Sequence, residues 1–161
     1  MTILMAAMAV NAMAQTIKAD SLSKIPLGSR VNFIMDFSDA TIHDRTESEF
    51  AKYEKDWEND KPSIVDKFRS AANLVLDKDL KFGDYPEADY QIVVTVKSIT
   101  TNGFMLCDVL LTNKEGAVFL KVENLKGNSD SFFTPGTKLA RIKIWSALTG
   151  GALGKLMKGR L

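Results

Sequence analysis

Alternating hydrophobic and polar positions predict four strands in this chain. The first covers Arg30–Phe37, and the other three follow one another as Tyr90–Val96, Phe104–Thr112 and Ala117–Leu125. Asn102-Gly103 separates the second strand from the third, and this pair favours a tight hairpin because both residue types accept positive φ. The last three strands are therefore expected to form an antiparallel meander.

The first predicted strand has one hydrophobic residue on its polar side. Val31, Phe33 and Met35 follow the period of two, but Ile34 does not. Strands covered on both faces have such continuous hydrophobic runs. We therefore expect both faces of this strand to be partly covered.

Helical patterns occupy two other parts of the chain. Residues 46–49, Thr-Glu-Ser-Glu, form a capping box that predicts a helix to about Asn59. Pro62 marks a restart, because proline is tolerated in a first helical turn, and helical spacing of apolar residues continues to Leu76. Pro135 opens a last helical stretch, which glycines 150 and 151 are expected to interrupt.

The order of these elements predicts an α+β fold. We expect a two-layer sandwich, in which a mainly antiparallel sheet of about four strands carries the helices on one face. A chain of 161 residues with 45% hydrophobic and 25% charged residues is typical of one globular domain. We assign residues 29–161 to that domain and residues 15–28 to a polar leader, which is either a linker or an edge segment.

Residues 1–14 have the pattern of a secretory signal peptide. Ile3–Val10 is apolar, and Ala12-Met13-Ala14 places small residues where a signal peptidase cleaves. The apolar run is shorter than the roughly 20 residues that span a bilayer, so we expect no transmembrane segment. The sequence therefore predicts a periplasmic or secreted protein.

Charge is unevenly distributed, although the net charge is only +1. Acidic residues dominate from Asp44 to Asp89, and basic residues dominate from Lys126 to Leu161. The basic segment either complements the acidic helices within the fold or docks on an acidic partner or a membrane surface. The near-neutral total lacks the basic footprint of a nucleic-acid-binding protein.

Two groups of residues near the C-terminus are candidates for contact with an envelope protein or a membrane. Phe132 and Phe133 lie in a polar loop, where they form either an exposed contact patch or an anchor for the last helix. Lys155, Lys158 and Arg160 form the basic end of that helix.

One loop collects most of the potential metal ligands. It contains Asp36, Asp39, His43 and Asp44, of which His43 is the only histidine. The spacing matches no known metal motif, and aspartates that bond local backbone amides explain the same residues, so we favour a turn. We predict no cofactor and no catalytic residue.

Aromatic and thiol side chains have similar alternative interpretations. Phe50, Tyr53 and Trp57 lie on one helical stripe, which we interpret as core rather than as a ligand-binding platform. Cys107 alternates with hydrophobic strand residues, so we interpret it as a buried residue rather than a reactive thiol.

Three segments carry a likeness to a known group of proteins: residues 33–39, residues 53–58 with Lys61-Pro62, and the strand pair around Asn102-Gly103. They resemble uncharacterised small secreted proteins of Bacteroidetes-type bacteria. The element order is more distantly similar to α/β domains of periplasmic envelope-assembly lipoproteins, whose lipidated cysteine is missing here. The resemblance implies export but no activity.

The function predicted from the sequence is that of a non-enzymatic exported module that binds an envelope partner. A metal-dependent or hydrolytic enzyme centred on residues 36–44 is the first alternative. The second is a membrane-surface protein that acts through the basic C-terminal helix.

Overall fold

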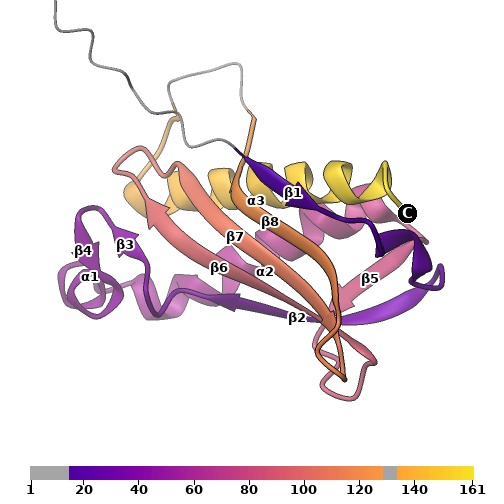
Figure 1. The fold of residues 1–161 in the computed structure, drawn as a ribbon. Coiled ribbons are helices and arrows are strands. Elements are labelled where there is room, and N and C mark those ends of the chain that lie inside the picture. The colour runs from indigo at the N-terminus through magenta and orange to yellow at the C-terminus, as the bar shows by residue number, and fades with distance from the viewer. Residues whose placement is uncertain (1–14, 129–133) are drawn as a thin grey trace, which may run out of the picture.

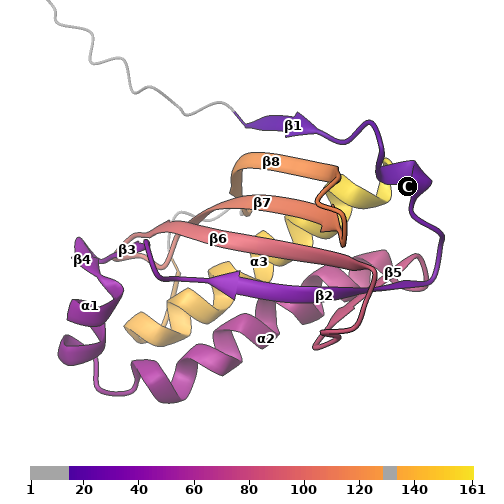
Figure 2. The same cartoon turned by 60° about the horizontal axis from the view of Figure 1, so that its bottom comes forward.

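The computed structural model describes residues 15–128 and 134–161. Their strands form one mixed eight-stranded sheet, and two long helices, α2 (Trp57–Leu76) and α3 (Lys138–Lys158), lie side by side on one face of it (Figures 1 and 2). The prediction of a sandwich with about four mainly antiparallel strands is therefore wrong. The sheet is larger, and part of its pairing is parallel.

The antiparallel half of the sheet contains the predicted meander. Strands β6 (Tyr90–Ile99), β7 (Met105–Asn113) and β8 (Val118–Lys126) pair in sequence order. Strand β1 (Thr16–Lys18) pairs antiparallel with β8, and the short helix η1 (Leu22–Lys24) follows it. The polar leader is thus an edge segment of the sheet.

The other half of the sheet is parallel. Strand β2 (Ser29–Asp36) pairs in parallel with β6 on one side and with β5 (Leu80–Gly83) on the other. Parallel neighbours need a long crossover, and α2 lies in the connection from β2 to β5. The side-chain amide of Asn73 in α2 accepts the N–H of Phe82 at 2.8 Å and donates to its carbonyl at 2.9 Å. Helix α2 therefore satisfies backbone groups of the edge strand β5.

A small excursion separates β2 from α2. It comprises β3 (Thr41–Ile42), β4 (Arg45–Thr46) and α1 (Glu47–Tyr53), and β3 pairs with the end of β6 in the same direction as β2. The predicted capping box of Thr46 is present, but the helix ends at Tyr53 rather than near Asn59. The excursion projects beyond the six main strands of the sheet at one end of the molecule, which we call the α1 end (Figures 1 and 2).

Helices α2 and α3 approach each other through glycines. A Cβ atom on Gly150 would lie 2.1 Å from the carbonyl oxygen of Phe68, and one on Gly154 would lie 2.9 Å from that of Ala72. The predicted interruption of the last helix at Gly150 and Gly151 is wrong, because α3 is continuous through both. Pro62 likewise lies inside α2, which begins at Trp57.

The second face of the sheet carries no helix among the described residues. Ile34, Val93 and Leu110 stand in register across β2, β6 and β7, and the side chains of Ile34 and Leu110 are each 39% exposed. The Ile34 side chain is thus partly covered, as expected, and β2 has a neighbouring strand on each side. The hydrophobic side chain of Ile34 belongs to the open face, whereas Val31 and Phe33 are buried.

Candidate functional site

The four potential ligand residues of the 36–44 loop, which we interpret as a turn, form no metal-binding group in the described part of the chain. The Asp36 carboxylate accepts the N–H of Ser38 at 2.9 Å, and this bond is the main cause that lowers the pKa of Asp36. His43 and Asp44 form the β3–β4 turn at φ 48° and 61°. No group of three or more His, Cys, Asp or Glu side chains in residues 15–128 and 134–161 is arranged to hold a metal ion.

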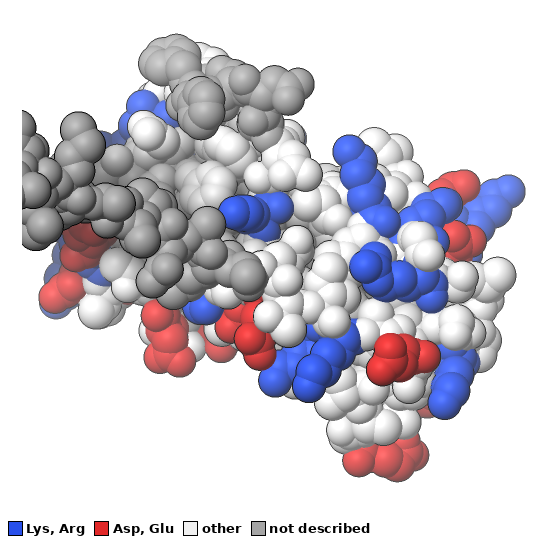
Figure 3. Space-filling view, turned by 45° about the horizontal axis from the view of Figure 1, so that its top comes forward, with Lys and Arg blue, Asp and Glu red and all other residues white. Residues whose placement is uncertain are grey.

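The basic C-terminal residues lie on the surface at the end of α3. Lys158 pairs with Asp79 at 3.3 Å, and a guanidinium nitrogen of Arg160 donates to the Leu156 carbonyl at 2.7 Å. Lys155 is exposed. Figure 3 shows Lys and Arg atoms gathered toward its right side, where Figure 1 places the C-terminus. Phe132 and Phe133 lie outside the described residues.

The thiol and the aromatic stripe divide between core and surface. Cys107 is fully buried, as predicted, and burial raises the pKa of its thiol far above the usual range. Phe50 and Trp57 are buried and pack edge to face at 5.2 Å, but Tyr53 is 53% exposed. The core interpretation therefore holds for two members of the stripe, and Tyr53 lies at the surface.

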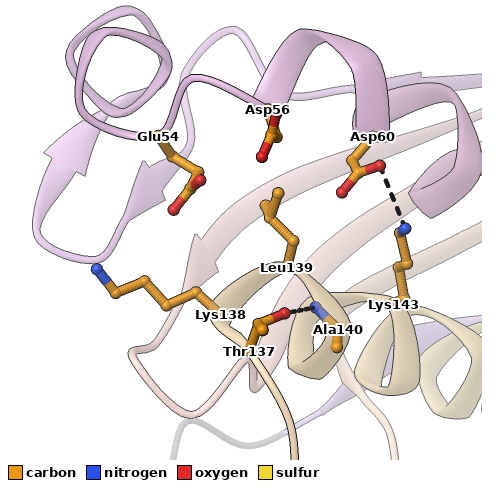
Figure 4. Close-up of a pocket in the computed structure, with 8 residues that line it drawn as sticks. All are labelled: Glu54, Asp56, Asp60, Thr137, Lys138, Leu139, Ala140 and Lys143. Carbon is orange, nitrogen blue, oxygen red and sulfur yellow. Dashed lines mark hydrogen bonds and ion pairs between the residues drawn. The ribbon is translucent and has the colours of Figure 1, made fainter.

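A cleft of about 480 Å³ separates the α1–α2 turn from the start of α3 (Figure 4). One wall of the cleft is the α1–α2 turn with the start of α2, and the other wall is the first turns of α3. Figure 4 shows the carboxylates of the first wall directed toward α3. The residues that line the cleft are Glu54, Asp56, Asp60, Thr137, Lys138, Leu139, Ala140 and Lys143.

The two walls of the cleft carry opposite charges. Asp60 and Lys143 close one end through an ion pair of 3.3 Å. Glu54 and Asp56 make no ion pair with any residue in the described part of the chain. On the α3 wall, the Thr137 hydroxyl accepts the N–H of Ala140 at 3.3 Å and caps the helix. The cleft can therefore contact a partner that carries groups of either charge.

Tyr53 joins two cations beside this cleft. The Arg45 guanidinium lies 4.2 Å from the centre of the Tyr53 ring, and the Lys138 ammonium lies 4.4 Å from it. Lys138 also donates a 2.8 Å hydrogen bond to the phenolic oxygen, which is the main reason why the pKa of Tyr53 is lowered.

His43 is buried within electrostatic range of these cations. Its ring packs edge to face on Phe50 at 5.0 Å. Burial lowers the pKa of His43, and repulsion from Lys138, Arg141 and Arg45 lowers it further. We call Arg45, Lys138 and Arg141 the cation cluster. No sequence pattern indicates this cluster, because its members come from β4 and α3 and meet only through the fold.

No family model and no curated protein matches the sequence. The chain is similar to the solved PelC dodecamer from Paraburkholderia phytofirmans, at 13% identity and a TM-score of 0.44 over 88% of this chain and 96% of that chain. It is also similar to protein XCC0632 from Xanthomonas campestris, of the DUF330 family model, at 10% identity and a TM-score of 0.36 over 89% of this chain and 90% of that chain.

At these TM-scores the likenesses carry no argument about function. The resemblance to Bacteroidetes-type secreted proteins stays a prediction, as does the signal peptide, which lies outside the described residues. Within residues 15–128 and 134–161, no helix combines the length and the hydrophobicity needed to cross a membrane.

Proposed function

We propose that this chain is a non-enzymatic binding module of the bacterial envelope, and that it holds its partner at the α1 end. The observation that carries the proposal is the cleft of Figure 4, where Glu54 and Asp56 face the start of α3 without ion-pair partners among the described residues. Export is part of the proposal, because it depends on the signal peptide predicted at residues 1–14.

The composition of the cleft favours binding over catalysis. An acid–base or nucleophilic site needs titratable groups within hydrogen-bonding distance of one another. Among the titratable side chains that line the cleft, the interaction found is the Asp60–Lys143 ion pair at 3.3 Å. Charged side chains that stay separated across an open cleft suit a complementary protein or polymer surface.

Site-specific photo-crosslinking in the native host tests the proposal. A photoreactive amino acid replaces Lys55, which is exposed between the lining residues Glu54 and Asp56. The matched control places it at Glu115, which is exposed in the β7–β8 turn away from the α1 end (Figures 1 and 2). We expect a discrete adduct from position 55 and none from position 115. Adducts from position 115 alone, or from neither position, would contradict the proposal.

A further inference from the structure

The cation cluster differs from the other half-buried Lys and Arg side chains of the described residues, because it has no ion pairs with carboxylates. Outside the cation cluster, each half-buried Lys or Arg among the described residues pairs with a carboxylate. These paired residues are Lys61, Arg69, Lys97 and Lys143. Arg45, Lys138 and Arg141 are also half-buried, but none has an ion pair with a described residue.

Unpaired charge in a half-buried place is unfavourable. A charge that loses water without gaining a counter-charge raises the free energy of the folded state. Lys138 and Arg141 also lie at the start of α3, where the helix dipole is positive and the first turn holds no acidic residue. An anion at this place would relieve all of these effects.

Two buried nitrogen atoms, one in the cation cluster and one in the histidine that interacts with it, lack hydrogen-bond partners among the described residues. They are Nε2 of His43 and Nε of Arg141. The His43 side chain is only 5% exposed and lies within electrostatic range of all three cations. Buried polar atoms are almost always hydrogen-bonded, so each such exception needs an explanation.

Backbone contacts hold Arg141 in place, and the Tyr53 side chain holds the other two members of the cluster. A Cβ atom on Gly103 would lie 2.6 Å from the carbonyl carbon of Arg141, so the β6–β7 turn packs directly on α3 at this residue. One guanidinium nitrogen of Arg141 donates to the Gly136 carbonyl at 3.3 Å, and Tyr53 fixes Arg45 and Lys138. A site that is already positioned binds with less loss of entropy than a flexible one.

We propose that Arg45, Lys138 and Arg141 bind an oxyanion, the phosphate or carboxylate group of the partner's surface. The inference rests on the proposed function and names the chemistry that the α1 end recognises. Guanidinium groups match both kinds of oxyanion, because they donate parallel hydrogen bonds. The Tyr53 ring carries Arg45 and Lys138 at the surface, beside the place of the bound group.

Oxyanion binding is linked to protonation of His43. The charged groups around the imidazole are Arg45 from β4 and Lys138 and Arg141 from α3, while Phe50 from α1 is uncharged. These cations disfavour a proton on His43, and a bound anion offsets them. The anion therefore raises the pKa of His43, and by linkage it binds more tightly as the pH falls.

Nuclear magnetic resonance of His43 tests the inference, because the chain has only one histidine. The chain is produced without a histidine tag, and the imidazole signals are followed through a pH titration. Sodium phosphate and sodium glucuronate are each compared with sodium chloride at equal ionic strength. We expect phosphate, glucuronate or both to raise the apparent pKa of His43 relative to chloride.

Charge-removing variants locate the effect. The rise in pKa should disappear in R45Q and in R141Q, and it should persist in K155Q, which removes an exposed lysine at the far end of α3. R45Q leaves the Arg141–Gly136 bond in place, so it stays informative if R141Q fails to fold. Equal pKa values in all three salts would overturn the inference. Binding to phosphatidylglycerol vesicles without any response to the soluble anions would also overturn it.

The crosslinking experiment separates the two proposals. An adduct from position 55 together with an unresponsive His43 would remove the oxyanion site and leave the binding module. The absence of both the adduct and the response would remove both.

Discussion

The middle and the beginning of α3 are built on opposite principles. In the middle, Gly150 and Gly154 bring the helix onto the backbone of α2, and the buried Ser146 hydroxyl donates to the Ile64 carbonyl at 2.7 Å. At the beginning, Lys138 and Arg141 bring charge close to a buried histidine without a described counter-ion. The middle of α3 thus makes its packing contacts and hydrogen bonds within the chain. In our proposal, the charged side chains at the beginning of α3 bind a partner. One helix can thus stabilise the fold with one part and bind with another.

The largest expected effect comes from G150A, in the middle of α3. The new methyl group would overlap the Phe68 carbonyl oxygen, because a Cβ atom at this position lies 2.1 Å from it, so the helices must move apart. Overpacking of this kind destabilises by about 3 kcal/mol. Urea unfolding followed by circular dichroism measures the change.

The neighbouring glycine provides the matched control. A Cβ atom on Gly151 meets nothing within 4 Å, so G151A should stabilise the helix by about 0.5–1 kcal/mol. Equal effects of the two substitutions would show that the helices are not in contact through Gly150.

A smaller loss is expected from T134V, just before α3. The Thr134 hydroxyl accepts the indole N–H of Trp145 at 2.8 Å in a buried place. Valine has nearly the same shape but leaves the indole N–H without a partner, which costs about 1–3 kcal/mol. In a double-mutant cycle, T134V should cost much less when Trp145 is already phenylalanine. An equal cost in both backgrounds would contradict the importance of this bond.

The dependence of stability on pH should reveal the unfavourable environment of a charged His43. Its pKa in the folded protein is lowered below the ordinary value of 6.5, first by burial and then by the three cations. The unfolded chain therefore takes up a proton on His43 more readily than the folded protein does. The contribution of neutral His43 to the free energy of unfolding is complete above about pH 6.5 and is lost as the pH falls below it.

H43N removes the titrating group and keeps the turn, because asparagine also accepts the positive φ of 48°. The loss in unfolding free energy between about pH 7.5 and about pH 5.5 should be smaller in H43N than in the parent chain. Parallel curves would indicate that His43 titrates alike in the folded and unfolded states.

The smallest effect on stability is expected from the double variant E54Q/D56N. Both carboxylates lie on the cleft wall and have no described ion-pair partner, so their removal should change the unfolding free energy by less than about 0.5 kcal/mol. The photo-adduct from position 55 should nevertheless decrease, as cleft charge is removed. Unchanged adduct formation in a folded variant would exclude these two carboxylates from the binding surface.

Local features of the sequence predict local structure well. The meander and the Thr46 capping box depend on neighbouring residues, and both are present. Strand β5 has only four residues, and its parallel pairing with β2 depends on the packing of α2, so alternation does not reveal it. The Gly150-Gly151 pair has the local pattern of a break, because the sequence does not show that α2 lies against Gly150.

The candidate site is harder to predict than the fold. Asp36, Asp39, His43 and Asp44 are neighbours in the sequence, but His43 acts with Arg45, Lys138 and Arg141, of which the α3 pair comes near it only in the tertiary structure. Tyr53 shares the helical spacing of two core aromatics, which predicts burial. It is exposed because the helix ends at this residue, before the stripe continues.

The most direct test of the contrast between the cation cluster and the middle of α3 is photo-crosslinking from position 55 in an R45Q/R141Q background. The unfolding free energy is measured on the same chain. We expect the adduct to disappear while the chain stays folded, because the cation cluster binds the partner and the middle of α3 stabilises the fold. An adduct that persists at the parental yield in the folded variant would contradict this assignment.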